Sequence, residues 1–250
     1  MPISKSIKGQ LVIYLTAVAV FLAIQDRDIA FLPICAVAVF LTASVESSLL
    51  YFRTKVFKLT SSSIITGLII GYVLSSDQGW WKFLAAAGFA IISKYTVLFN
   101  KKHVFNPAAL GIFLAMVLFG ATTQWKGTYS WYIFLPAGIY FAAKSGKLRI
   151  LISYFLVSLV LFGIQALGQG VPLGNIFGYL SYFYIFIMVI EPKTSPVDHT
   201  GQVSFGCGIA ILIFMLTAWG ARFDVELFSL LVGNLAVLLI RKISLKKAAV

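Results

Sequence analysis

The chain has 250 residues, of which 60% are hydrophobic and 11% charged, and its mean hydropathy is +0.95. Soluble domains carry roughly 25% charged residues, so this composition excludes an ordinary soluble protein and indicates an integral membrane protein. A formal net charge of +12 would suggest nucleic-acid binding in a soluble protein, but here the basic residues flank apolar stretches, where they orient a membrane protein. We expect the lipid bilayer as a partner and no nucleic acid.

The apolar stretches are about 17–22 residues long, which favours transmembrane helices over the short alternating strands of a β-barrel. Every connection between them is short, so residues 1–250 are predicted to form a single, all-α membrane domain. In chain order, the sequence predicts ten transmembrane helices at roughly 10–25, 29–51, 62–75, 80–98, 104–120, 130–143, 148–167, 173–190, 202–219 and 224–241.

The distribution of basic residues sets an orientation for these spans. With the N-terminus in the cytoplasm, fifteen lysines and arginines fall in inner segments, and only Arg27, Lys126 and Arg222 fall in outer ones. Lysine and arginine are concentrated in the cytoplasmic loops of membrane proteins. The sequence therefore predicts a multi-pass protein of the inner (plasma) membrane with both termini in the cytoplasm.

Ten spans divide into five and five after Gly120, giving repeat one at about 1–120 and repeat two at about 130–250. Because five is odd, the second set begins on the opposite side of the membrane, so any repeat would be inverted. The third span is short, and glycine and proline interrupt the entry to the eighth, between Gly170 and Asn175. Interrupted segments at matching positions predict a ligand site at the centre of the protein.

The chain re-enters the membrane through a polar helix start, Phe-Asn-Pro-Ala-Ala, after a short basic loop. Asn106 and Pro107 fit this start structurally, because asparagine caps free N–H groups and proline suits the first helical position. A helix start beside a cavity would also attract an anionic or carbonyl group of a ligand. Lys94, before the loop, would either extend to the inner interface or pair with Glu191 at the end of the eighth span.

Hydroxyl groups cluster at the start of the third span, on Ser62, Ser63 and Thr66. In transmembrane helices such hydroxyls often bond only to their own helix or to a neighbouring one. Together with Gly67, they would also let a flat ligand approach the backbone. Glu46, near the inner end of the second span, has no obvious partner in the sequence.

The turn after the eighth span is polar. The proline that follows Glu191 restricts its backbone and ends the helix, and Thr194 and Ser195 come next. Glu191 and Asp198 are the acidic residues of an inner surface that is otherwise basic. This contrast favours a ligand site or a subunit contact over an ordinary loop.

Four sequence blocks follow one another in the order typical of one membrane-protein family. The blocks are Leu59–Leu68 with the pair Trp80-Trp81, Ala90–Lys94, Phe105–Ala109, and Glu191–Pro196 with Gly201 and Gly206. In these blocks the chain resembles the NqrB/RnfD family, membrane subunits of the sodium-pumping NADH:quinone reductase and of the Rnf electron-transport complex. The resemblance covers nearly the whole chain from Leu49 onward.

The resemblance implies a fold of ten helices in two inverted five-helix repeats, similar to that of urea transporters. It also implies that the protein binds a flavin (FMN or riboflavin), passes electrons across the membrane coupled to sodium or proton movement, and contacts other Rnf/Nqr-like subunits. In the family, one FMN is esterified to a threonine in a Ser-Gly-Ala-Thr motif that an acidic residue precedes. Here Gly120-Ala121-Thr122 matches the end of this motif, but Phe119 replaces serine and the acidic residue is missing. We therefore expect a non-covalent flavin and no ester at Thr122.

The first hypothesis is a membrane subunit of an Rnf/Nqr-like complex that binds a flavin non-covalently and relays electrons. The alternatives are a stand-alone channel or carrier of urea-transporter-like fold for a small solute, such as a flavin, and a structural assembly subunit. No side chain is predicted to be catalytic, and the two histidines do not have the spacing of a metal site. The residues predicted to bind the cofactor are Ser62, Ser63, Thr66, Gly67, Lys94, Asn106, Pro107, Glu191, Thr194 and Ser195.

Overall fold

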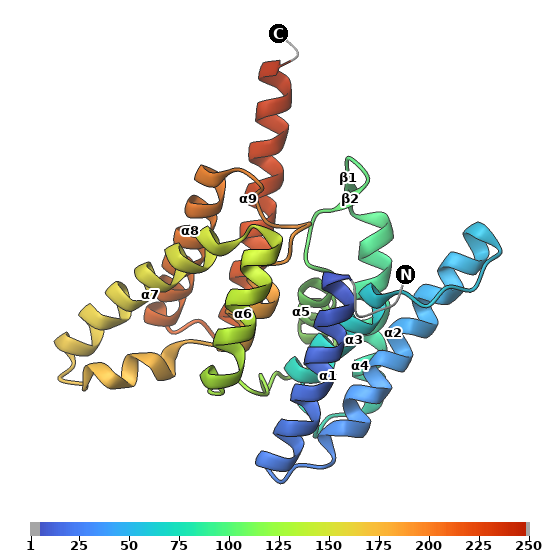
Figure 1. Ribbon diagram of the computed structural model, residues 1–250, viewed down its shortest axis with the longest axis horizontal. Coiled ribbons are helices and arrows are strands. Elements are labelled where there is room, and N and C mark those ends of the chain that lie inside the picture. Colours follow the sequence, from blue (N-terminus) through green and yellow to red (C-terminus); the bar gives the residue numbers. More distant parts are fainter. Residues whose placement is uncertain (1–5, 249–250) are drawn as a thin grey trace. The chain divides into compact units, whose positions relative to one another are not determined.

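The computed structural model describes residues 6–248, with side chains through residue 243, so the two ends of the chain, predicted to be cytoplasmic, lie outside the described residues. The described part is mostly helical (Figure 1). Its helices agree with the predicted all-α membrane class. Within this range, four helices are long and apolar enough to cross a membrane, namely α1 (Ile7–Gln25), α2 (Phe31–Thr54), α7 (Leu148–Gly168) and α8 (His199–Trp219).

The other α-helices also coincide with predicted spans, although α9 extends beyond its predicted end. The predicted shortness of the third span is confirmed, because α3 has 13 residues. At 1.5 Å per residue this is about 20 Å, less than the roughly 30 Å of bilayer hydrocarbon. These helices are α3 (Ser61–Val73), α4 (Trp80–Thr96), α5 (Pro107–Phe119), α6 (Trp131–Ser145) and α9 (Val225–Ala248).

The eighth predicted span, 173–190, is not one continuous helix, in keeping with the interruption predicted at its entry. It consists of a 3₁₀ helix, η2 (Leu173–Tyr179), and a π-helix, η3 (Tyr184–Val189), separated by residues 180–183, of which Leu180 is extended. Two glycines and an asparagine within η2 disfavour a regular α-helix. Figure 1 shows η2 running back along α7, and the two elements are in contact.

The chain forms two compact units. The first comprises the residues up to Leu98 together with Pro107–Gly127, and the second comprises Phe99–Asn106 and the residues from Thr128 onward. The division after Gly127 falls close to the predicted division between the two repeats. The segment Phe99–Asn106 departs from that scheme, because it comes from the first half of the chain and belongs to the second unit.

Glycines allow close helix packing within each unit. In the first unit, a methyl group added to Gly67 of α3 would lie 2.5 Å from the Cα atom of Val39 in α2. In the second unit, a methyl group added to Gly206 of α8 would lie 2.1 Å from the Oγ atom of Ser153 in α7. Small residues of this kind let membrane helices approach each other through their backbones. Gly67, a predicted ligand residue, thus has a packing role in α3.

A short hairpin leads into the second unit. Its strands are β1 (Leu98–Phe99) and β2 (Lys102–His103). The two turn residues, Asn100 and Lys101, have φ angles of 49° and 62°, as a type I′ hairpin turn requires. The predicted basic loop is therefore an ordered hairpin that positions His103.

The predicted orientation can be tested with single cysteines in a variant whose native Cys35 and Cys207 are changed to alanine. Tyr129→Cys, in the loop after α5, should react with a membrane-impermeant maleimide from outside, since Tyr129 is 72% exposed and few basic residues lie on that side. Phe57→Cys, 71% exposed between α2 and α3, should react only after permeabilisation. The reverse pattern would contradict a cytoplasmic N-terminus.

Candidate functional site

A buried amide links two of the predicted site segments in the second unit. Asn106 is 2% exposed and Asn234 of α9 is 1% exposed. The backbone N–H of Asn106 donates a hydrogen bond to Oδ1 of Asn234 at 2.9 Å. The Nδ2 of Asn234 donates to the carbonyl oxygen of Thr194 at 3.4 Å. One carboxamide therefore joins Asn106, at the end of the segment Phe99–Asn106, to the polar turn that follows η3.

The polar turn is built around Glu191. The hydroxyl of Ser195 donates to the carbonyl oxygen of Glu191 at 2.7 Å, and the hydroxyl of Thr194 donates to its carboxylate at 3.4 Å. His103 of the hairpin lies on the same carboxylate, with Nε2 3.1 Å from Oε1. Three predicted residues, Glu191, Thr194 and Ser195, are thus brought together, and His103 is their additional partner.

Basic side chains surround the carbonyl oxygens of this turn. Arg241 donates to the carbonyl oxygen of Ser195 at 3.2 Å, and Lys147 donates to that of Pro196. Burial, and then the positive charge of Arg241, lower the pKa of Lys147 to about 8. Two basic side chains therefore flank the turn, and they are suited to a neighbouring anionic group.

The first unit holds a buried ion pair that the sequence did not predict. Lys94 of α4 pairs with Glu46 of α2 rather than with Glu191, so the predicted pairing was wrong. Glu46 is 1% exposed, and its carboxylate also accepts hydrogen bonds from Tyr95 at 2.6 Å and from Thr60 at 2.5 Å. The physical reason is that Glu46, 48 positions away in the chain, lies on a helix packed against α4.

The hydroxyls predicted to face a ligand make bonds within α3 and its cap. Ser63 donates to the carbonyl oxygen of Thr60 at 2.8 Å, and Thr66 donates to that of Ser62 at 2.9 Å. These hydrogen bonds agree with a structural role for the hydroxyls, in which they bond to their own helix. Their predicted role in binding a cofactor stays a prediction.

Thr122 lies in the ordered segment that follows α5 in the first unit. Its backbone N–H donates to Oε1 of Gln78 at 3.1 Å, and its carbonyl oxygen accepts from the N–H of Ser75 at 2.9 Å. The side chain is exposed. Pro107, the other predicted residue near a helix end, is buried as the first residue of α5.

Sequence reasoning did not include Asn234 and Arg241 among the site residues. A signal for Asn234 was present, because an amide inside an apolar helix needs a hydrogen-bonding partner. A signal for Arg241 was weaker, since a basic residue at the inner end of a helix is commonly explained by the membrane interface. Neither partner could be read from local spacing, because Asn234 and Asn106 are 128 positions apart.

The apolar helices and their buried polar clusters are those of a helical membrane protein. Sequence comparison shows to which family of membrane proteins the chain belongs. A sequence model of the NQR2, RnfD, RnfE family matches residues 116–249, which is more than half of the chain. The chain belongs to the NQR2, RnfD, RnfE family, and the resemblance seen in the sequence is confirmed.

The chain is also similar to curated proteins that are named as subunits of an ion-translocating oxidoreductase complex, in each case its D component. It is 22% identical to the one from Ectopseudomonas mendocina, with 70% of each chain covered. It is 23% identical to the one from Pseudomonas aeruginosa strain LESB58, with 76% of each chain covered. The relative from Buchnera aphidicola is 22% identical, with 81% of this chain and 82% of the relative covered.

Proposed function

We propose that this protein is a membrane subunit of an Rnf-type ion-translocating oxidoreductase complex, binds FMN or riboflavin non-covalently and relays electrons coupled to ion movement. Family membership and the names of the relatives support the role of subunit over a stand-alone carrier. The flavin would supply the redox chemistry, and the residues of this chain would bind and orient it.

The observation that carries the flavin proposal is the buried polar cluster of Asn106, Asn234 and Thr194. Amides and hydroxyls can both donate and accept hydrogen bonds, which matches the carbonyl and N–H groups at the edge of a flavin ring. The nearby Lys147 would suit the phosphate of FMN. Buried groups of this kind are costly in an apolar protein unless they are satisfied, and they mark functional sites.

The interrupted eighth span also fits a bound polar ligand. Ser181 lies between η2 and η3 and is 6% exposed. Its hydroxyl has no hydrogen-bond partner among the described residues. A buried hydroxyl without a partner costs free energy, so a ligand group that bonds to it would be favoured. Discontinuous helices are where many membrane proteins place their ligands.

The proposal includes the predicted arrangement of ten spans as two inverted repeats in the inner membrane, with both termini in the cytoplasm. The division into two units near Gly127 supports the two halves. The excess of basic residues in the segments assigned to the cytoplasm supports the orientation. Maleimide labelling of Tyr129→Cys and Phe57→Cys tests that orientation directly.

The non-covalent character of the flavin is the first test of this proposal. Acid denaturation of the purified protein should release the flavin into the supernatant, and the protein band on a denaturing gel should not fluoresce, even after co-expression with a flavin transferase. The reason is that Phe119 replaces the motif serine before Gly120-Ala121-Thr122. A fluorescent band that disappears in Thr122→Val would overturn this expectation and assign a covalent flavin to Thr122.

A further inference from the structure

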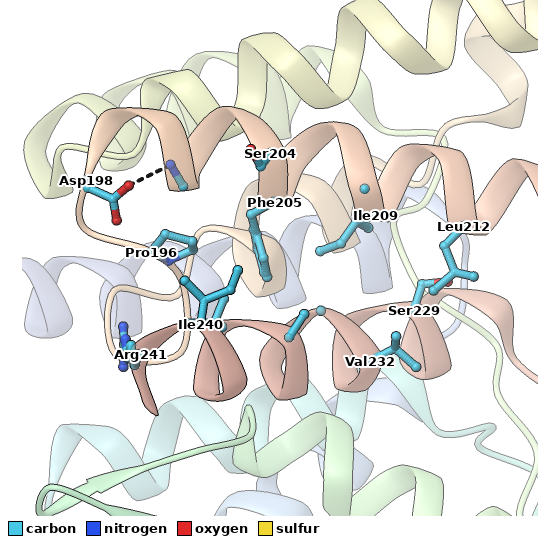
Figure 2. Close-up of a pocket in the computed structure, with 15 residues that line it drawn as sticks. Pro196, Asp198, Ser204, Phe205, Ile209, Leu212, Ser229, Val232, Ile240 and Arg241 are labelled. Carbon is cyan, nitrogen blue, oxygen red and sulfur yellow. Dashed lines mark hydrogen bonds between the residues drawn. The ribbon is translucent and has the colours of Figure 1, made fainter. Parts of the chain in front are cut away.

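A groove of about 250 Å³ separates α8 from α9 in the second unit. Figure 2 shows Phe205 and Ile209 of α8 facing Ile240 and Val232 of α9 across it. Gly208 also lines the groove, and a methyl group added there would have no atom within 4 Å. The walls are therefore mainly apolar, and there is space above Gly208.

One end of the groove is polar and carries the two charged residues of its lining. Figure 2 shows Asp198 and Arg241 at that end, with Pro196 between them. Arg241 forms no salt bridge with any described carboxylate, and Lys147 lies close enough for its charge to interact with that of Arg241. Asp198 carries a negative charge at this end. Its carboxylate accepts a hydrogen bond from the N–H of Gly201 at 2.7 Å and caps α8. The positive end of the α8 dipole therefore offsets it.

The dimensions of the groove fit a slender chain. Its α9 wall runs from Ser229 to Arg241, which is about 18 Å at 1.5 Å per residue. Half of the bilayer hydrocarbon is about 15 Å thick, so this length matches one acyl chain of one leaflet.

We propose that this groove binds an anionic phospholipid of the cytoplasmic leaflet, with one acyl chain between α8 and α9 and the phosphate at Arg241. Any bilayer lipid could contact the apolar walls. Selection for an anionic head group follows from a guanidinium that has no acidic partner among the described residues, since charge-assisted hydrogen bonds to phosphate are strong. Basic pockets at the cytoplasmic ends of membrane helices bind anionic lipids in this way. The inference does not depend on flavin binding.

The test uses vesicles of equal parts phosphatidylcholine and phosphatidylglycerol. Wild-type protein is incorporated, re-extracted in mild detergent, and its retained lipids are quantified by mass spectrometry. Phosphatidylglycerol should be enriched about ten-fold over phosphatidylcholine, the factor that one charge-assisted hydrogen bond supplies. Arg241→Gln should abolish the enrichment, and Gly208→Leu, which fills the groove, should reduce the total lipid retained. Lys242→Gln, on the neighbouring exposed lysine, and Val203→Leu, on the exposed surface of α8, are matched controls that should behave as wild type.

Two results would overturn the proposal. One is wild-type protein that retains the two lipids in their input ratio. The other is enrichment that survives both Arg241→Gln and Gly208→Leu in protein whose thermal stability is unchanged. Because Arg241 also bonds to the turn at Ser195, Arg241→Gln could unfold the protein. In that case Gly208→Leu alone decides, and unchanged lipid retention in that variant counts against the site.

Discussion

Glu46→Leu is expected to destabilise the protein by about 3–5 kcal/mol, the usual cost of removing one partner from a buried ion pair. The two side chains of this pair are 9% exposed for Lys94 and 1% for Glu46. The substitution leaves the Lys94 ammonium without its carboxylate and removes the acceptor of the Tyr95 and Thr60 hydroxyls. Unfolding monitored by tryptophan fluorescence during detergent or heat titration measures the loss.

Two companion variants separate the ion pair from a general effect on α2. Ser48→Leu changes an exposed position of the same helix and should leave stability within about 0.5 kcal/mol of wild type. Glu46→Leu combined with Lys94→Met should recover most of the loss, because an apolar pair can replace a buried ion pair. If Glu46→Leu alone is as stable as Ser48→Leu, Glu46 is not buried against Lys94.

Asn234→Leu should strip the flavin from the second unit during purification, with a loss of affinity of about ten- to a hundred-fold. This rests on the proposed function. The variant removes the amide that holds Asn106 and Thr194 in place, so a buried ligand hydrogen bond to one of these segments, worth about 1–3 kcal/mol, would be lost. A loss of about 1.4–2.8 kcal/mol corresponds to that range of affinity. Flavin per chain, measured by fluorescence after acid release, is the readout.

Asn106→Leu provides a second route to the same result. It removes the side-chain amide and keeps the backbone N–H that bonds to Asn234. It therefore tests ligand binding by the Asn106 side chain and leaves the hydrogen bond between Asn106 and Asn234 intact. Leu239→Ala, at a position of α9 that is 51% exposed, is the control for general damage to the helix. If both asparagine variants are as stable as the control and keep their full flavin content, the cluster does not hold the cofactor.

The helices could be predicted from the sequence because long apolar stretches specify them locally. The α7 stretch, Leu148–Gly168, and the α8 stretch, His199–Trp219, were predicted within a few residues. The form of the eighth span was harder to predict. An apolar stretch as long as residues 173–190 can form one helix or two short ones. The glycines and the proline between Gly170 and Asn175 indicated the interruption.

The contacts within the candidate site were less predictable, because they join residues distant in the chain. The polar turn at Glu191 was found from its composition, but its partner His103 comes from a hairpin 88 positions earlier. The sequence left two alternatives for Lys94, extension to the inner interface or pairing with Glu191, and spacing alone did not point to Glu46. Its true partner, Glu46, follows from the packing of α2 against α4.

The most direct test of the central claim is the reduced-minus-oxidised spectrum of affinity-tagged protein purified from its native host in mild detergent. A membrane subunit of an Rnf-type complex that holds a flavin should co-purify with other identified membrane subunits of that complex. Its flavin absorption bands should bleach on reduction and return on reoxidation. A colourless chain that purifies alone and takes up no added flavin would contradict the proposed function.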